Sequence, residues 1–205
     1  MRKKIKICGI QSDADITIMN TLKPDFIGYV FYPKSKRYVE PSKARALNRR
    51  LDPSIRTVGV FVNESVEKVT ETVHQATIDI VQLHGDEDEA YVNQLRNQTD
   101  AEIIKVFRVK DGSGDFPPMD VDYYLFDSRV KAYGGVGQTF DWNILKTITL
   151  DKPIILAGGI GADNIGEALR TQAAILDVSS AVEVNGKKDF TLTKNMIETL
   201  RRYTA

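Results

Sequence analysis

Eight short runs rich in β-branched residues alternate with amphipathic or polar stretches from one end of the chain to the other. This alternation is typical of βα units, in which successive strands pair in parallel. The predicted strands cover residues 3–8, 26–31, 57–62, 78–84, 103–108, 123–127, 153–157 and 174–178. Helical patterns cover residues 13–22, 42–49, 65–74, 87–96, 142–147, 163–170 and 192–201. Residues 111–118, between the fifth and sixth strands, are rich in Gly and Pro, so we expect the fifth helix to be short or absent.

Eight strands with seven helical patterns in 205 residues predict an α/β fold, a closed (β/α)8 TIM barrel. This length lies at the small end of the usual range of about 200 to 400 residues. No linker, low-complexity stretch or block of like charge divides the chain, so residues 1–205 are predicted to form a single barrel domain. An open doubly wound sheet is the alternative that the same pattern allows.

The chain carries 28 Lys and Arg residues and 28 Asp and Glu residues. A chain without net charge lacks the field that would hold it on nucleic acid or on an anionic membrane, so we expect neither as a partner. No apolar run approaches the ~20 residues that span a bilayer, and the basic start lacks the apolar region of a signal peptide. Cys8 is the single cysteine and cannot form an internal disulfide, so we expect a cytoplasmic protein. The sequence does not determine the oligomeric state, and a monomer is favoured.

The chemistry of a barrel enzyme sits where the strands end and the βα loops begin. Cys8 is the last residue of the first predicted strand, and alternation places it opposite Ile5 and Ile7, facing the barrel mouth. A lone cysteine is usually only a small buried hydrophobe, so this position alone does not establish a function. Asp127 follows four apolar residues at the end of the sixth strand, where a buried carboxylate needs a partner or a catalytic role.

Other polar groups follow strands two and four. Arg37 lies in a cationic loop and offers a planar fork suited to a carboxylate, although it can equally be a solvated charge. Gln82 and His84 share one face of the fourth strand, which predicts that both point into the mouth and need partners that a ligand can supply.

The loops after strands seven and eight carry glycines and serines on the same predicted face. In barrels these loops commonly bind phosphate through exposed backbone N–H groups and a short extra helix. We therefore expect a small phosphorylated molecule as partner, held by Gly158, Gly159, Ser179 and Ser180. A dinucleotide-binding fingerprint is the rival interpretation, but Asn164 stands where its third glycine belongs. Residues 133–140 are glycine-rich and predict a lid over the site.

Seven motifs occur together and in order: KICGI at 6–10, KSKR at 34–37, VGVFVN at 58–63, VQLHG at 81–85, YGGVGQTFDW at 133–142, LAGGI at 156–160 and DVSSAVE at 177–183. This combination, which spans nearly the whole chain, resembles the phosphoribosylanthranilate isomerase family of tryptophan biosynthesis. The resemblance implies an aldose–ketose isomerase that performs an Amadori rearrangement of N-(5-phosphoribosyl)anthranilate without a metal or organic cofactor.

The resemblance also implies roles for individual residues. By the matching motifs, Asp127 is the general acid and Cys8 the general base, which must act as a thiolate. Arg37 is similar to the family residue that holds the anthranilate carboxylate, and His84 is a mouth residue without a defined role. Two positions depart from the family pattern: Ala181 replaces a usual glycine in the phosphate loop, and Ala162 lies where a proline is common.

Two alternatives remain at the level of the sequence. Another phosphosugar-handling barrel enzyme, such as an aldolase or a sugar isomerase, could use Lys105 for a Schiff base. A non-catalytic phosphate-binding protein would keep the glycine and serine loops but would need neither Cys8 nor Asp127.

Overall fold

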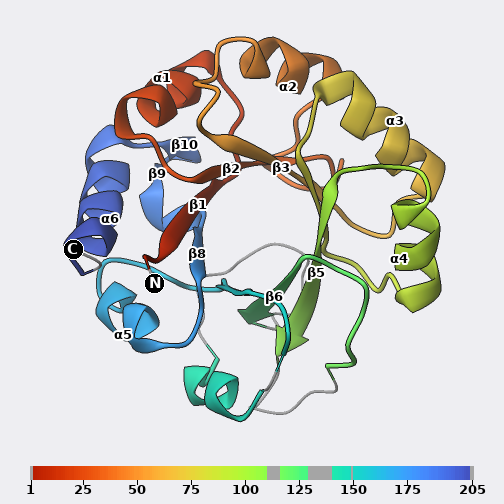
Figure 1. The fold of residues 1–205 in the computed structure, drawn as a ribbon. Coiled ribbons are helices and arrows are strands. Elements are labelled where there is room, and N and C mark those ends of the chain that lie inside the picture. Colours follow the sequence, from red (N-terminus) through yellow and green to blue (C-terminus); the bar gives the residue numbers. More distant parts are fainter. Residues whose placement is uncertain (1, 110–115, 129–139, 149, 204–205) are drawn as a thin grey trace.

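The computed structural model describes residues 2–109, 116–128, 140–148 and 150–203. Eight parallel strands form a closed barrel in which each strand pairs with the next along the chain (Figure 1). The strands are β1 (Lys4–Cys8), β2 (Phe26–Val30), β3 (Arg56–Phe61), β4 (Ile80–Leu83), β5 (Glu102–Val109), β6 (Tyr123–Ser128), β7 (Ile154–Leu156) and β8 (Ile175–Val178). All eight predicted strands are confirmed. Because β8 also pairs with β1, with Lys4 opposite Ile175, the sheet is closed and the open doubly wound alternative is wrong.

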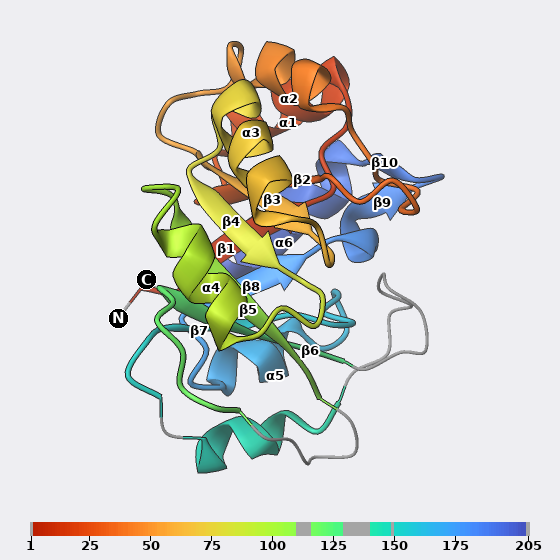
Figure 2. The ribbon, with the colours of Figure 1, turned by 90° about the vertical axis from the view of Figure 1, so that its right-hand side faces the viewer.

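Helices surround the strands, as Figure 2 shows from the side. They are α1 (Asp13–Leu22), α2 (Pro41–Asn48), α3 (Val66–Ala76), α4 (Glu89–Arg96), α5 (Ile165–Arg170) and α6 (Phe190–Tyr203). A capping box fixes the start of α1: the Ser12 side chain accepts a hydrogen bond from the backbone of Asp15, and the Asp15 side chain accepts one from the backbone of Ser12. None of the described helices is long and apolar enough to cross a membrane.

The predicted helix over residues 142–147 is a short 3-10 helix, η1 (Trp142–Thr147), rather than an α-helix. Asp141 caps it by accepting from the backbone of Asn143. Between β5 and β6 the described residues contain no helix, which agrees with the expectation of a short or absent one; residues 110–115 lie outside the described part of the chain.

After β8, the chain forms elements that the sequence analysis did not predict. A 3-10 turn, η2 (Ser180–Val182), leads into an antiparallel hairpin of β9 (Glu183–Val184) and β10 (Lys187–Lys188). The turn residues Asn185 and Gly186 both have positive φ, 51° and 75°. Asn-Gly is the strongest short-range hairpin signal in a sequence, so this dipeptide alone indicates the hairpin.

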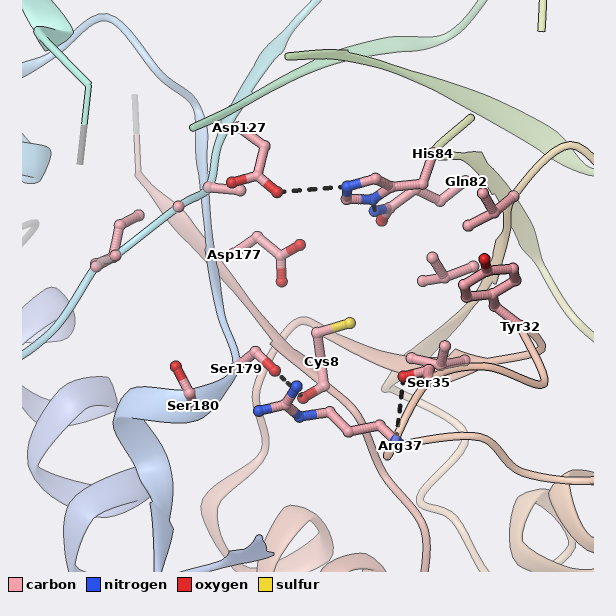
Figure 3. A pocket seen from close by; sticks show the side chains of 17 residues that line it. Cys8, Tyr32, Ser35, Arg37, Gln82, His84, Asp127, Asp177, Ser179 and Ser180 are labelled. Carbon is pink, nitrogen blue, oxygen red and sulfur yellow. Dashed lines mark hydrogen bonds and ion pairs between the residues drawn. The ribbon is translucent and has the colours of Figure 1, made fainter. Parts of the chain in front are cut away.

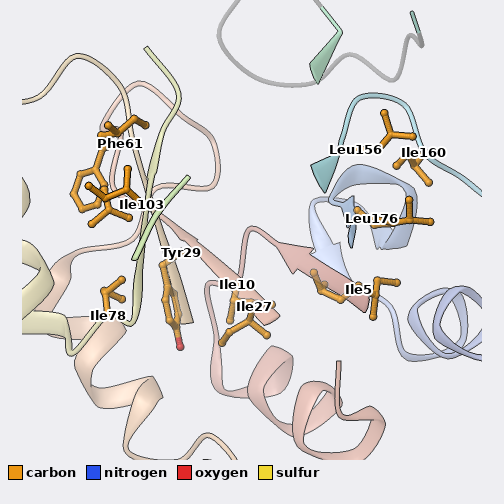
Figure 4. Packing of buried hydrophobic residues seen from close by; sticks show 14 of the residues in the cluster. Ile5, Ile10, Ile27, Tyr29, Phe61, Ile78, Ile103, Leu156, Ile160 and Leu176 are labelled. Carbon is orange, nitrogen blue, oxygen red and sulfur yellow. The ribbon is translucent and has the colours of Figure 1, made fainter. Parts of the chain in front are cut away.

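Strand alternation divides the core into two layers. Ile5 and Ile7 pack against the surrounding helices, within the cluster drawn in Figure 4, as predicted. Inside the barrel, a separate cluster that includes Val58, Leu125 and Ile155 fills the space between the strands. The interior is therefore packed, and the open space lies at the mouth above it.

Candidate active site

One pocket at the carboxyl ends of the strands brings together the predicted catalytic, substrate-binding and phosphate-binding residues (Figure 3). These residues are Cys8, Arg37, His84, Asp127, Gly158, Gly159, Ser179 and Ser180. They line one pocket in the structure, and their chemical roles stay predictions. Residues 133–139 of the predicted lid lie outside the described residues. The described residues contain no group of three or more His, Cys, Asp or Glu side chains placed to hold a metal.

Cys8 ends β1 and its side chain faces the pocket. Gly28 on β2 gives the sulfur its room, because a Cβ built on Gly28 would lie 2.8 Å from Cys8 Sγ and 3.3 Å from Lys6 Nζ. Burial raises the pKa of the Cys8 thiol, the positive charges of Lys6 and Lys188 lower it, and the negative charge of Asp177 raises it. Burial prevails, so the pKa stays above its ordinary value.

Lys6 and Asp177 form a buried ion pair, and Asp177 lines this pocket. Lys6 Nζ lies 2.7 Å from Asp177 Oδ2, and the two side chains are only 1% and 9% exposed. They stand directly opposite each other in the β1–β8 ladder. Burial lowers the pKa of Lys6, but the charges of Asp177 and Cys8 outweigh it and raise the pKa overall. Asp177 Oδ1 is buried without a hydrogen-bond partner, and Figure 3 shows this carboxylate pointing into the pocket with Asp127 and Cys8.

Asp127 lies near the end of β6, and its Oδ2 is 3.4 Å from His84 Nε2. The side-chain nitrogen of Gln82 lies 3.1 Å from His84 Nδ1. If the Gln82 amide donates to Nδ1, the proton of a neutral His84 ring sits on Nε2, toward Asp127. Asp127 Oδ1 is buried without a hydrogen-bond partner. Gly158, with φ of 85°, lets the β7 loop pass close to this oxygen, since a Cβ there would lie 2.5 Å from it.

Arg37 does not project freely into the pocket. Its Nε and Nη2 donate to Glu183 Oε1 and Oε2, both at 2.7 Å. Glu183 also accepts from Lys188 Nζ at 2.7 Å. The same ammonium group donates to the backbone carbonyls of Cys8 and Ser179, at 2.5 and 3.2 Å. The β9–β10 hairpin therefore joins Arg37 to the end of β1.

The glycine and serine loops lie next to one another at the mouth. Gly158 and Gly159 have positive φ, 85° and 68°, a backbone shape that favours glycine. Ser179 donates its hydroxyl to the Cys8 carbonyl at 3.2 Å, which fixes the β8 loop against β1. Ala181 lies beside this loop and is not among the residues with positive φ, so the missing glycine causes no backbone strain there.

Four charged residues of this region were not selected from the sequence: Lys6, Asp177, Glu183 and Lys188. Asp177 and Glu183 lie within the motif DVSSAVE, but only its serines had been assigned a function. The lysine considered for a Schiff base, Lys105, is 4% exposed and binds Glu87 Oε2 at 2.8 Å. It is not among the residues that line the pocket, so Lys105 does not support the aldolase alternative.

The fold and the pocket define the class of protein. This is a (β/α)8-barrel enzyme whose mouth brings together a carboxylate, a thiol and a cationic cluster. The chain belongs to the phosphoribosylanthranilate isomerase family, because the model described as "N-(5'phosphoribosyl)anthranilate (PRA) isomerase" matches residues 5–199.

Individual relatives agree with this assignment. The chain is 44% identical to the N-(5'-phosphoribosyl)anthranilate isomerase of Caldanaerobacter subterraneus subsp. tengcongensis, over 97% of this chain and 98% of the relative. The solved phosphoribosyl anthranilate isomerase from Thermotoga maritima is 34% identical, with a TM-score of 0.85 over 98% of this chain and 99% of that one. A further isomerase structure is 28% identical, with a TM-score of 0.79 over 98% and 99% of the two chains. It was solved in complex with reduced 1-(o-carboxyphenylamino)-1-deoxyribulose 5-phosphate.

Proposed function

We propose that this chain converts N-(5-phosphoribosyl)anthranilate to 1-(2-carboxyphenylamino)-1-deoxyribulose 5-phosphate, with Asp127 as general acid and Cys8 as general base. The observation that carries the proposal is their placement. A carboxylate with one unpartnered oxygen and the only thiol of the chain line the same pocket of a family member.

The first step is opening of the ribose ring. In the proposal, protonated Asp127 delivers its proton to the ring oxygen while the bond from that oxygen to C1 breaks and the aniline nitrogen supplies the electron pair that forms an iminium ion. Asp127 lines the pocket in which the ribose ring would lie. His84 Nε2, 3.4 Å from Asp127 Oδ2, orients the carboxyl group.

The second step removes a proton from C2. The Cys8 thiolate takes this proton, the C–H electron pair neutralises the iminium, and the resulting enol becomes the ketone by proton transfer back to carbon. Lys6 favours the thiolate that this step needs, since its charge lowers the pKa of Cys8 against the effect of burial. The iminium itself is a further positive charge that favours the thiolate once the ring is open.

Two anion sites hold the substrate across these groups. The backbone of the β7 and β8 loops, at Gly159 and Ser179, would bind the phosphate. Arg37 would bind the anthranilate carboxylate.

A single free thiol suits the reducing cytoplasm, where we place the protein. We expect a monomer, and sedimentation at working concentration tests that expectation.

Turnover of N-(5-phosphoribosyl)anthranilate by the purified chain, followed by anthranilate fluorescence, tests the proposal. Positioned acids and bases contribute about 10² to 10⁴-fold, so Asp127→Asn and Cys8→Ala should each lose at least about 10²-fold in kcat. Asp163→Asn, an exposed carboxylate, is the matched control and should keep full activity. Exchange of the C2 hydrogen with solvent should disappear in both site variants.

The two roles separate in a single-turnover experiment. Asp127→Asn should block ring opening, whereas Cys8→Ala should still open the ring and stall before loss of the C2 proton. Near-normal turnover by a folded Cys8→Ala variant contradicts the assigned base and redirects the search to His84.

A further inference from the structure

Arg37 is held in place before any ligand arrives. Glu183 binds the edge of the guanidinium formed by Nε and Nη2, through two hydrogen bonds of 2.7 Å. A guanidinium has five N–H groups, and this contact uses two of them. Among the described residues, no other hydrogen bond to the guanidinium is found, so three donors remain, two of which form the edge between Nη1 and Nη2. Arg37 lines the pocket and is 19% exposed on its side chain.

Lys188 completes the cluster from the buried side. Its ammonium group donates to the carbonyls of Cys8 and Ser179 and to Glu183, and three acceptors require all three of its hydrogens. Its side chain is 1% exposed. Burial lowers the pKa of Lys188 and outweighs the hydrogen bond and charge of Glu183, which raise it. The protonated state is the one that satisfies this geometry.

The charges of the cluster add to one net positive charge. Arg37 and Lys188 contribute two positive charges and Glu183 one negative charge, with its pKa lowered because the hydrogen bonds from Arg37 and Lys188 outweigh the effect of burial. One carboxylate on the ligand neutralises the cluster. Without Glu183, the two positive charges of Arg37 and Lys188 would repel each other in a poorly solvated place, and the Arg37 guanidinium would lose the contact that holds it.

The stem of Arg37 is also constrained. Gly9, with φ of 89°, lies against it, and a Cβ built there would be 2.4 Å from Arg37 Cδ. The backbone nitrogen of Arg37 donates to the hydroxyl of Ser35 at 3.1 Å. Both ends of the side chain are therefore fixed, which lowers the entropy lost when a ligand binds.

We propose that Glu183 is the positioning residue for carboxylate recognition: it occupies one edge of the Arg37 guanidinium and so presents the other edge to the aromatic carboxylate of the substrate. This inference rests on the proposed function, in which Arg37 contacts that carboxylate. It assigns the β9–β10 hairpin, whose strand β9 begins at Glu183, to substrate selection.

The experiment compares two ligands by calorimetry. One is reduced 1-(o-carboxyphenylamino)-1-deoxyribulose 5-phosphate, and the other is the same compound with a plain phenyl ring. Glu183→Gln should weaken binding of the first about tenfold or more and leave the second within about twofold, since one charge-assisted bidentate contact contributes on the order of 1.5–3 kcal/mol. The KM for substrate should rise while kcat stays within about threefold. Glu89→Gln, an exposed glutamate on α4, is the control.

A second variant separates position from charge. Glu183→Asp keeps the negative charge but is one methylene shorter, so it cannot reach both Arg37 and Lys188. It should show the same selective loss as Glu183→Gln. Binding equal to the unmodified protein in Glu183→Asp, or tighter binding of the carboxylate ligand in Glu183→Gln, overturns the proposal, because either result means that Glu183 acts only through its charge.

Arg37→Ala distinguishes this inference from the proposed function. It should lose the carboxylate ligand selectively, and adding Glu183→Gln to it should cause no further selective loss. If Arg37→Ala weakens both ligands equally, the carboxylate role of Arg37 itself is wrong. If Arg37→Ala is selective but Glu183→Gln weakens both ligands equally, only the positioning role is wrong and Glu183 is structural.

Discussion

Replacing Lys6 by Met should destabilise the folded protein far more than its position on a short strand suggests. The Lys6 side chain is 1% exposed, and its ammonium group lies 2.7 Å from a carboxylate that is 9% exposed. Met fills similar volume and leaves no large cavity, so the effect isolates the charge. Removing one partner of a buried ion pair typically costs about 3–5 kcal/mol, because the other charge stays buried without compensation.

The cost can be expressed as a melting temperature. For a chain of this length, each kcal/mol lowers Tm by about 2–4 °C, so Lys6→Met should lower Tm by roughly 6–20 °C. Lys4→Met is the matched control. Lys4 is exposed on the same strand and lies 5.6 Å from the Phe26 ring centroid, so its loss should cost no more than about 1 kcal/mol.

A double-mutant cycle tests the physical cause. Asp177→Asn should also destabilise the protein, because it leaves the Lys6 charge buried alone. The double variant Lys6→Met/Asp177→Asn removes both charges and should be no less stable than either single variant. Equilibrium urea unfolding at neutral pH measures all four proteins. Additive losses of unfolding free energy in the double variant, or a loss of under about 1 kcal/mol in Lys6→Met, refute the argument that each buried charge compensates the other.

Three further predictions concern activity. Because burial raises the pKa of Cys8, the thiolate fraction and kcat/KM should rise with pH above neutrality, and Lys6→Met, which removes a charge that lowers this pKa, should move that rise to higher pH in a pH–rate profile. Gly158→Ala would place a Cβ 2.5 Å from Asp127 Oδ1, so kcat should approach that of Asp127→Asn while circular dichroism shows a retained fold. Gly159→Ala, at φ of 68°, adds strain of about 1–2 kcal/mol to the phosphate loop and should raise the inhibition constant of inorganic phosphate.

The fold could be predicted because its strands are short, buried and regularly spaced. Alternation along β1 assigned Ile5 and Ile7 to the helix layer and Cys8 to the mouth, and both assignments hold. Prediction failed where the elements are too short to show a period. The two-residue strands of the β9–β10 hairpin have none, and only the Asn185-Gly186 turn signals them.

The candidate site could be predicted for a different reason. The rule that barrel chemistry lies at strand ends selected Cys8 and Asp127 before any distance was known. What the rule cannot supply is the partner of each group. The sequence predicts that Arg37 binds a carboxylate of the ligand, but it does not predict the bond to Glu183, 146 residues away, which depends on the β9–β10 hairpin.

The missed charges share a location: they lie at the seam where β8 closes the barrel against β1. Lys6 and Asp177 are partners in that ladder, although 171 residues separate them. Lys188 binds the carbonyl of Cys8 at the end of the same strand. A buried charge on β1 needs an opposite charge, and closure of the barrel leaves only β2 and β8 beside it. The described residues of β2 carry no charge, so the partner of Lys6 must come from β8, where Asp177 is the only charged residue. The environment of the Cys8 thiol is thus completed only when the first and last strands meet, which makes ionisation of Cys8 a property of the closed barrel and not of the motif that contains it.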